Sequence, residues 1–194
     1  MAATTHISIP AGKPLYPLAN GDRLSRGDFE RRYAAMPEIK KAELIRGVVY
    51  MGSPVRVEQH ARQHALLVAW AANYMAATAG VEVADNATVR LSADSEPQPD
   101  LLIRVLPEHG GRNYDRHDKL GAYREAGVCE YLVWRVLDGQ VDWFELQAGK
   151  YVPLAADGKG QLESGVLPGL RLDVAALLAE NAAKLFQTLQ EGVQ

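Results

Sequence analysis

The stretch SEPQPDLLIRV, residues 95–105, places an acidic residue at the start of a predicted buried strand. Turn-forming residues lead to Pro99, and the apolar run LLIRV follows at once. An apolar run bounded by turn signals is typical of a strand inside a sheet. Asp100 stands between the two. A carboxylate held there can bind a divalent cation at the rim of the sheet, or it can simply cap the preceding turn.

Composition restricts what kind of protein carries this strand. The chain has 194 residues, of which 47% are hydrophobic and 23% charged, and this suits a single globular core. We expect a Pro/Gly-rich N-terminal arm over residues 1–24 and one domain over residues 25–194. With 21 basic against 24 acidic residues, the net charge of -3 gives no overall basic footprint. A nucleic-acid partner would therefore have to meet a local patch.

Cysteine usage and the N-terminus indicate the compartment. Cys129 is the single cysteine, so the chain cannot form an internal disulfide, and a reducing compartment is the simpler fit. Its apolar surroundings, VCEYLVW, predict a buried and inert thiol. The N-terminus lacks the basic start and apolar core of a signal peptide. No apolar stretch approaches the roughly 18 residues of a membrane span. We expect a cytoplasmic protein with no membrane partner.

Periodicity and turn signals predict the elements of the first half. Ser25 is a candidate N-cap for a short helix that ends before Pro37. The run AELIRGVVYMGSP reads as a hairpin around Arg46-Gly47. A helix is predicted over residues 58–79, with one face formed by Ala61, Ala65, Val68, Ala72 and Met75. The runs VEVA and ATVRLS then predict two strands.

The second half adds a helix, a hairpin and a closing helix. The run DRHDKLGAYREAG predicts a helix that ends at Gly127. Asp138-Gly139 is a strong turn signal between the strands CEYLVWRV and VDWFELQ. The tail LDVAALLAENAAKLFQTLQ predicts one amphipathic helix capped by Asp173. This order of elements predicts an α/β (α+β) protein, with a mixed central β-sheet flanked by helices.

Segments in a fixed order carry a resemblance to a known family. They are AELIRGVVYMGSP, HARQHALLVAW, VRLSADSEPQPDLLI and DRHDKLGAYREAGVCEYLVWRV. Together they resemble the Uma family of endonuclease-like proteins, which have the restriction-endonuclease-like PD-(D/E)xK fold. The resemblance covers roughly residues 25–147 and continues more loosely to the C-terminal helix.

The resemblance implies a site and a reaction. The family's motif residues fall on Glu43 of ELIRG, on His60 after SP, on Asp100 of QPD and on Lys119 before YREAG. It implies that the acids bind Mg²⁺ or Mn²⁺, with Asp100 as the metal ligand, and that Lys119 supports the attacking water. A divalent metal can polarise the phosphoryl oxygen and lower the pKa of a water nucleophile. DNA is the implied substrate, and we expect a homodimer.

One part of the family pattern is missing. Members carry a further strand with a second acid between the Asp strand and the Lys helix. Here that interval contains only Glu108 beside a Gly-Gly loop, which does not suit a buried strand. Either the sequence lacks a stretch between Arg112 and Asn113, or the protein is a shortened relative with a reduced site.

Each candidate residue also has a purely structural interpretation. Glu43 can pair with Arg46 or Lys41 on the surface of a strand. His60 and His64 have the i, i+4 spacing of zinc ligands, but the glutamate of a zinc hydrolase is missing between them, so polar-bonded histidines fit better. Lys119 lies in a charged run that a solvated helix face explains.

Three functions follow from these alternatives. The leading hypothesis is a metal-dependent DNA endonuclease. The second is an inactive protein of the same fold that serves as a DNA-binding or protein-interaction module, which the missing acid favours. The third is a structural or small-ligand domain unrelated to nucleic acid.

Overall fold

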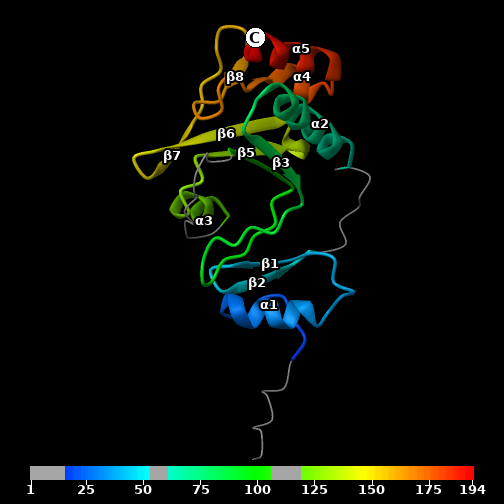
Figure 1. Ribbon diagram of the computed structural model, residues 1–194, viewed down its shortest axis with the longest axis vertical. Coiled ribbons are helices and arrows are strands. Elements are labelled where there is room, and N and C mark those ends of the chain that lie inside the picture. The colour runs from blue at the N-terminus through cyan, green and yellow to red at the C-terminus, as the bar shows by residue number, and fades with distance from the viewer. Residues whose placement is uncertain (1–15, 53–60, 106–118) are drawn as a thin grey trace, which may run out of the picture.

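The computed structural model describes residues 16–52, 61–105 and 119–194, and side chains from residue 121 in the last range (Figure 1). Its helices are α1 (Arg26–Ala34), α2 (Ala61–Ala77), α3 (Lys119–Glu125), the 3-10 helix η2 (Val136–Asp138), α4 (Val174–Leu178) and α5 (Ala182–Val193). Its strands are β1 (Ala42–Ile45), β2 (Val48–Met51), β3 (Val81–Asp85), β4 (Leu101–Val105), β5 (Glu130–Arg135), β6 (Gln140–Gln147), β7 (Lys150–Pro153), β8 (Gln161–Glu163) and β9 (Arg171–Asp173). The predicted α+β class is confirmed.

The described strands all pair antiparallel. They form the sheets β1-β2, β3-β4, β5-β6-β7 and β8-β9, which are separate from one another in this part of the chain. The strands are therefore divided among small sheets, with the helices packed between and beside them (Figure 1). The molecule is elongated, with α1, β1 and β2 at one end and α4 and α5 at the other.

The end that contains α1 has a small core of its own. Ser25 caps α1 as predicted, because its hydroxyl accepts a hydrogen bond from the Asp28 N–H at 3.2 Å. Phe29 is fully buried against β1 and β2. Leu18 is also buried there, although it belongs to the stretch predicted as an arm. The boundary between an N-terminal arm (residues 1–24) and a single domain (residues 25–194) stays a prediction.

The larger core lies between α2, the strands that follow it and the C-terminal helices. Trp70 and Trp143 meet edge to face with ring centroids 6.0 Å apart, and the Trp70 indole N–H donates to the Arg171 carbonyl at 3.0 Å. The buried face of α2 is Trp70, Ala71 and Tyr74. The face predicted through Ala61, Ala65 and Met75 is wrong, because these residues are exposed. Large aromatic side chains gain more from burial than alanines do, and they set the helix rotation.

The C-terminal segment is two helices instead of the single one predicted. Asp173 caps the first, since its Oδ1 accepts from the Ala176 N–H at 2.8 Å. The chain then breaks at Glu180, whose φ is 51°, and Asn181 caps α5 by accepting from the Lys184 N–H at 3.1 Å. Asparagine has a side chain that competes for backbone donors, so it starts a helix more readily than it continues one.

Two further predictions are wrong. Residues 87–92 form no strand; instead the Val89 N–H donates to the Pro97 carbonyl at 2.9 Å, and the segment folds back on the loop that follows it. Cys129 is exposed, because β5 begins one residue later, at Glu130. Among the described residues, no helix combines the length and apolar character that crossing a bilayer requires.

Candidate functional site

Asp100 lies at the end of the turn that leads into β4, as its sequence position predicts. Its side chain is 75% exposed, and its Oδ1 accepts a hydrogen bond from Lys41 Nζ at 2.8 Å. The Asp100 backbone carbonyl accepts from the Asn86 N–H at 3.2 Å, which ties the turn to the end of β3. The carboxylate is therefore held at the sheet rim and remains accessible to solvent.

Glu43 is buried in β1, with only 7% of the residue exposed. Its Oε1 accepts a hydrogen bond from the Gln98 backbone N–H at 2.7 Å. The structural interpretation of Glu43 placed it on the surface of the strand, and this prediction is wrong. A charged acceptor makes a stronger hydrogen bond than a neutral one, so Glu43 fixes the QPD segment against β1.

The QPD segment lies along β1 because it pairs with that strand. Leu44 and Glu96 exchange backbone hydrogen bonds, with Glu96 N–H donating to the Leu44 carbonyl at 2.6 Å and Leu44 N–H donating back at 3.2 Å. Gln98 adds a side-chain bond to Thr88 Oγ1 at 3.1 Å. The pairing thus places Glu43 beside the segment that leads to Asp100, and we call these two residues the carboxylate pair.

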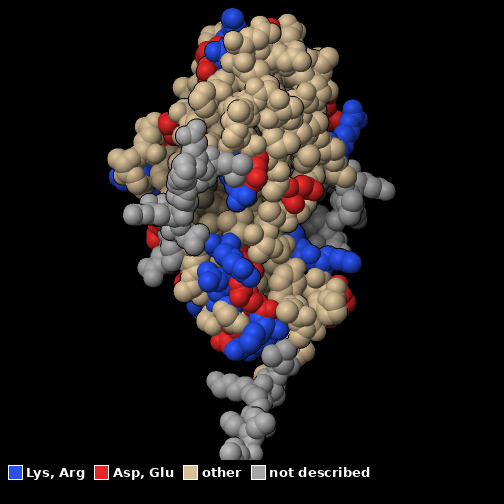
Figure 2. Space-filling view, viewed as in Figure 1, with Lys and Arg blue, Asp and Glu red and all other residues tan. Residues whose placement is uncertain are grey.

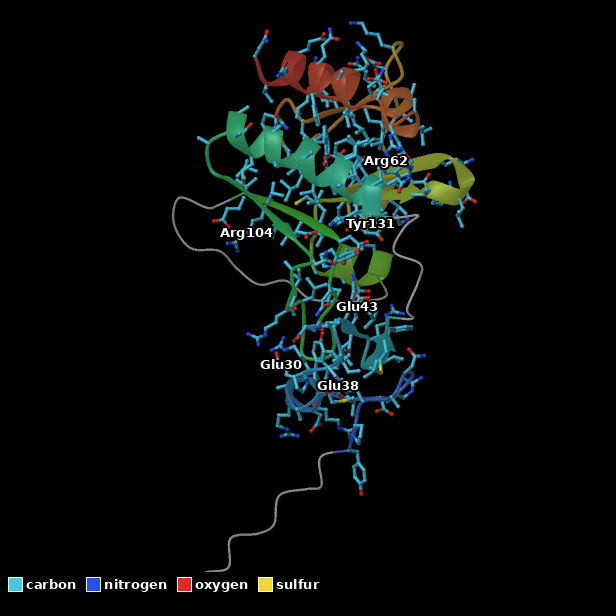
Figure 3. All side chains as sticks on the ribbon, turned by 90° about the vertical axis from the view of Figure 1, so that its right-hand side faces the viewer. Glu30, Glu38, Glu43, Arg62, Arg104 and Tyr131 are labelled. Carbon is cyan, nitrogen blue, oxygen red and sulfur yellow. The ribbon has the colours of Figure 1, made fainter. Side chains whose placement is uncertain are left out.

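Tyrosines from α3 and β5 lie next to the carboxylate pair. The rings of Tyr123 and Tyr131 are 5.2 Å apart. Burial raises the pKa of Tyr123 above its ordinary value, and the neighbouring Tyr131 and the negative charges of Glu43 and Asp100 raise it further. Burial, then Asp100 and Glu43, likewise raise the pKa of Tyr131. Figure 3 shows Glu43 on the side of β1 that faces α3, with Tyr131 beyond that helix.

The other residues implied by the family resemblance are described only in part. Lys119 is the first residue of α3, the helix that carries Tyr123, but its side chain lies outside the described residues. His60, Glu108, Arg112 and Asn113 also lie outside them. A pocket shared by Lys119 and Asp100 therefore stays a prediction, as does the part of His60.

Sequence reasoning missed the partners that position the carboxylate pair. The sequence predicts Lys41 only as a partner for Glu43, whereas in the structure Lys41 pairs with Asp100. Residues two apart in a strand share a face, so the spacing of Lys41 and Glu43 was a usable signal. The Gln98 backbone N–H, by contrast, gives no signal in the sequence.

The histidine of α2 makes a separate polar contact. His64 Nε2 lies 2.6 Å from Asp85 Oδ1, at the end of β3. This agrees with the polar-bonded interpretation of the His60 and His64 spacing. In the described residues no group of three or more His, Cys, Asp or Glu side chains could hold a metal ion.

The carboxylate pair fits a magnesium ion by the chemistry of its donors. Mg²⁺ prefers hard oxygen ligands, and proteins commonly hold it through one or two carboxylates, with waters and substrate phosphates completing the shell. Glu43 and Asp100 supply such oxygens, and Asp100 is open to solvent. A zinc site of nitrogen and sulfur ligands does not match this donor set.

A second pair of acids, Glu96 and Glu30, joins the same loop to α1. Glu96 is 4% exposed, and its carboxyl group faces Glu30 of α1, with Arg90 Nε 3.8 Å from Glu96 Oε2. Burial, then the hydrogen bond and the negative charge of Glu30, raise the pKa of Glu96 to about 7. A carboxyl group with this pKa holds a proton in mildly acidic solution and can donate it to Glu30.

Comparison with known proteins gives a family. The model of the Uma2 family, described as "Putative restriction endonuclease", matches residues 27–112 and 108–175. The two stretches meet at residues 108–112, where the sequence departs from the expected pattern. No curated protein matches the chain. The matched residues cover most of the chain and include Glu43, Asp100 and Lys119, so the protein belongs to the Uma2 family.

Proposed function

We propose that this protein is a divalent-metal-dependent DNA endonuclease whose site is built on the carboxylate pair. The observation that supports the proposal is reciprocal: Glu43 bonds the N–H of Gln98, two residues before Asp100, and Asp100 pairs with Lys41, two residues before Glu43. Both acids lie on positions that match the family's motif. Membership of a restriction-endonuclease family supports a nuclease over the other classes.

The position of each site residue suggests its role in the reaction. Glu43, braced and buried, would orient the metal, and exposed Asp100 would bind it where a phosphate can approach. A bound Mg²⁺ or Mn²⁺ would polarise the phosphoryl oxygen and lower the pKa of a water. That water forms the new P–O bond as the bond to the leaving oxygen breaks. Lys119 would support the water from α3, with His60 as an auxiliary group.

A second candidate is supported by a specific observation. The sequence of residues 106–118 has no run that resembles the family's second acidic strand, and the family match is divided at that place. A site with two carboxylates in place of three would bind metal more weakly. The second candidate is therefore an inactive DNA-binding or protein-interaction module of the same fold. A homodimer in the cytoplasm is part of either proposal.

Cleavage of supercoiled plasmid tests the proposal. Wild-type protein should nick or linearise DNA with Mg²⁺ or Mn²⁺ and lose activity in EDTA and in Asp100→Ala. The matched control is Asp138→Asn. Asp138 is an exposed residue of η2 that pairs with Arg135 of β5, and its substitution should leave cleavage unchanged. Plasmid that stays intact with every metal contradicts the nuclease and favours the binding module.

A further inference from the structure

A hollow lies between α3 and the β6–β7 hairpin. It encloses about 210 Å³ and is lined by Gly121, Arg124, Lys150 and Tyr151. Two of these residues carry positive charge, and none of the lining residues that the structure describes is an acid. We call it the basic hollow.

Local backbone structure sets the positions of the two cations, Arg124 and Lys150. Gly121 and Arg124 are three apart on α3, so they share a face of that helix. Lys150 follows the two-residue hairpin loop of Ala148 and Gly149, whose φ angles of 48° and 78° suit the twist of the strands. Gly121 has no side chain, and it lines the hollow together with Arg124.

The two cations of the basic hollow are less engaged in ion pairs than most arginines of the described chain. Most arginines of the described chain form ion pairs with acids on other segments or one helical turn away: Arg26, Arg31, Arg32, Arg62, Arg90, Arg104, Arg135 and Arg171. Arg124 meets only the adjacent Glu125, at 3.3 Å, and keeps most of its five donors. No acid of the described residues forms an ion pair with Lys150. The charges that Figure 2 shows around α1, by contrast, are basic and acidic side chains mixed together.

A row of tyrosines joins the basic hollow to the carboxylate pair. Tyr151 lines the hollow, and its ring is 6.4 Å from that of Tyr131, which is 5.2 Å from that of Tyr123. Tyr123 and Tyr131 feel the charges of Glu43 and Asp100. The Tyr151 hydroxyl is engaged with the Val128 carbonyl at 2.7 Å, so this tyrosine forms a fixed wall. These tyrosines therefore pack between the wall of the basic hollow and the residues that the charges of Glu43 and Asp100 affect.

We infer that the basic hollow binds a backbone phosphate of the DNA strand that is cleaved. Arginine can grip a phosphate with two parallel N–H bonds, and lysine adds a compact charge. The inference rests on the proposed function for its ligand and deepens it, because it assigns Arg124 and Lys150 to holding the strand. These residues position the substrate and take no part in the chemistry.

The test is the salt dependence of DNA binding by Arg124→Gln/Lys150→Gln in EDTA, where cleavage cannot interfere. Fluorescence anisotropy of a labelled duplex gives the slope of log K against log salt. Loss of one phosphate contact should reduce the slope by about one. The matched control is Lys159→Gln/Lys184→Gln, which removes the same charge from the β7–β8 connection and α5 and should leave the slope unchanged. Thermal unfolding checks that both variants are folded.

The outcomes separate this inference from the nuclease proposal. A smaller slope in the Arg124/Lys150 variant alone supports the inference, whether or not the wild type cleaves plasmid. Equal slopes overturn it and leave the cleavage result standing. Absence of DNA binding by the wild type also overturns it. Inorganic phosphate at constant ionic strength is the last probe: if it binds through Arg124 while the DNA slopes stay equal, the hollow serves free phosphate and the inference is wrong.

Discussion

Replacing Glu96 with Gln should abolish a pH dependence of stability that the structure builds into the QPD loop. Glu96 pairs with β1 through its backbone and buries its carboxyl group against Glu30. Gln keeps the shape and can donate the same hydrogen bond to Glu30 from its amide. It carries no charge at any pH, so the substitution isolates the cost of ionising a buried acid.

The magnitude follows from the pKa. A rise from 4.5 to about 7 corresponds to roughly 3 kcal/mol in favour of the protonated form. The folded protein keeps the Glu96 proton between those two values, whereas the unfolded chain releases it. The contribution is therefore complete below pH 4.5 and is lost as the pH rises to about 7. The hydrogen bond from Glu96, and after it Arg90, lower the pKa of Glu30, and this opposite effect on stability acts below pH 4.5.

Urea unfolding, followed by the fluorescence of the buried Trp70 and Trp143, measures the effect from about pH 5 to about pH 8. The wild type should lose up to roughly 3 kcal/mol over this range relative to Glu96→Gln. At about pH 8 the variant should be the more stable protein. Glu82→Gln, at an exposed acid paired with Arg104, is the control and should follow the wild type. Parallel curves for wild type and Glu96→Gln would refute the reasoning.

Three shorter predictions concern other parts of the chain. Asp173→Ala removes the α4 cap and the acceptor of the Ala176 N–H, and should cost about 1 kcal/mol in urea unfolding. Gly169→Ala should cost about 2 kcal/mol or more in thermal unfolding, because φ is 75° and a Cβ would overlap the backbone of α5; an unchanged melting temperature would contradict this. Lys41→Met removes the cation 2.8 Å from Asp100 and should tighten Mg²⁺ binding up to about fivefold in calorimetry, because an exposed pair is worth at most about 1 kcal/mol. Weaker binding would show that Lys41 supports the metal site.

Local chemistry made much of the fold predictable. The Ser25 cap, the Arg46-Gly47 turn and the Asp173 cap each depend on a few neighbouring residues, and all are present. The rotation of α2 was not predictable in the same way, because alanines fit either face and distant partners such as Trp143 decide which one is buried. The break at Glu180, by contrast, had a local signal in Asn181, which caps α5, although the helical pattern continues through it.

The family motifs name residues for the candidate site, and these stay predictions, but the motifs do not indicate the contacts that hold those residues. Motif resemblance located Glu43 and Asp100, and turn chemistry explained why an acid precedes β4. The contact that orients them is a backbone N–H of Gln98, and any residue except proline carries one. Pairing between residues 44 and 96 is a long-range contact with no local signal.

A double-mutant cycle on cleavage tests most directly whether Glu43 and Asp100 form one site. The variants are Glu43→Gln, which keeps an acceptor for the Gln98 N–H, Asp100→Asn, and the two combined. Plasmid cleavage with Mg²⁺ is measured with enzyme in excess. We predict that each single change slows cleavage at least about a hundredfold and that the double variant is little slower than either, because residues that act as a unit are not additive. Multiplied losses, or a single variant with wild-type activity, would contradict a shared site.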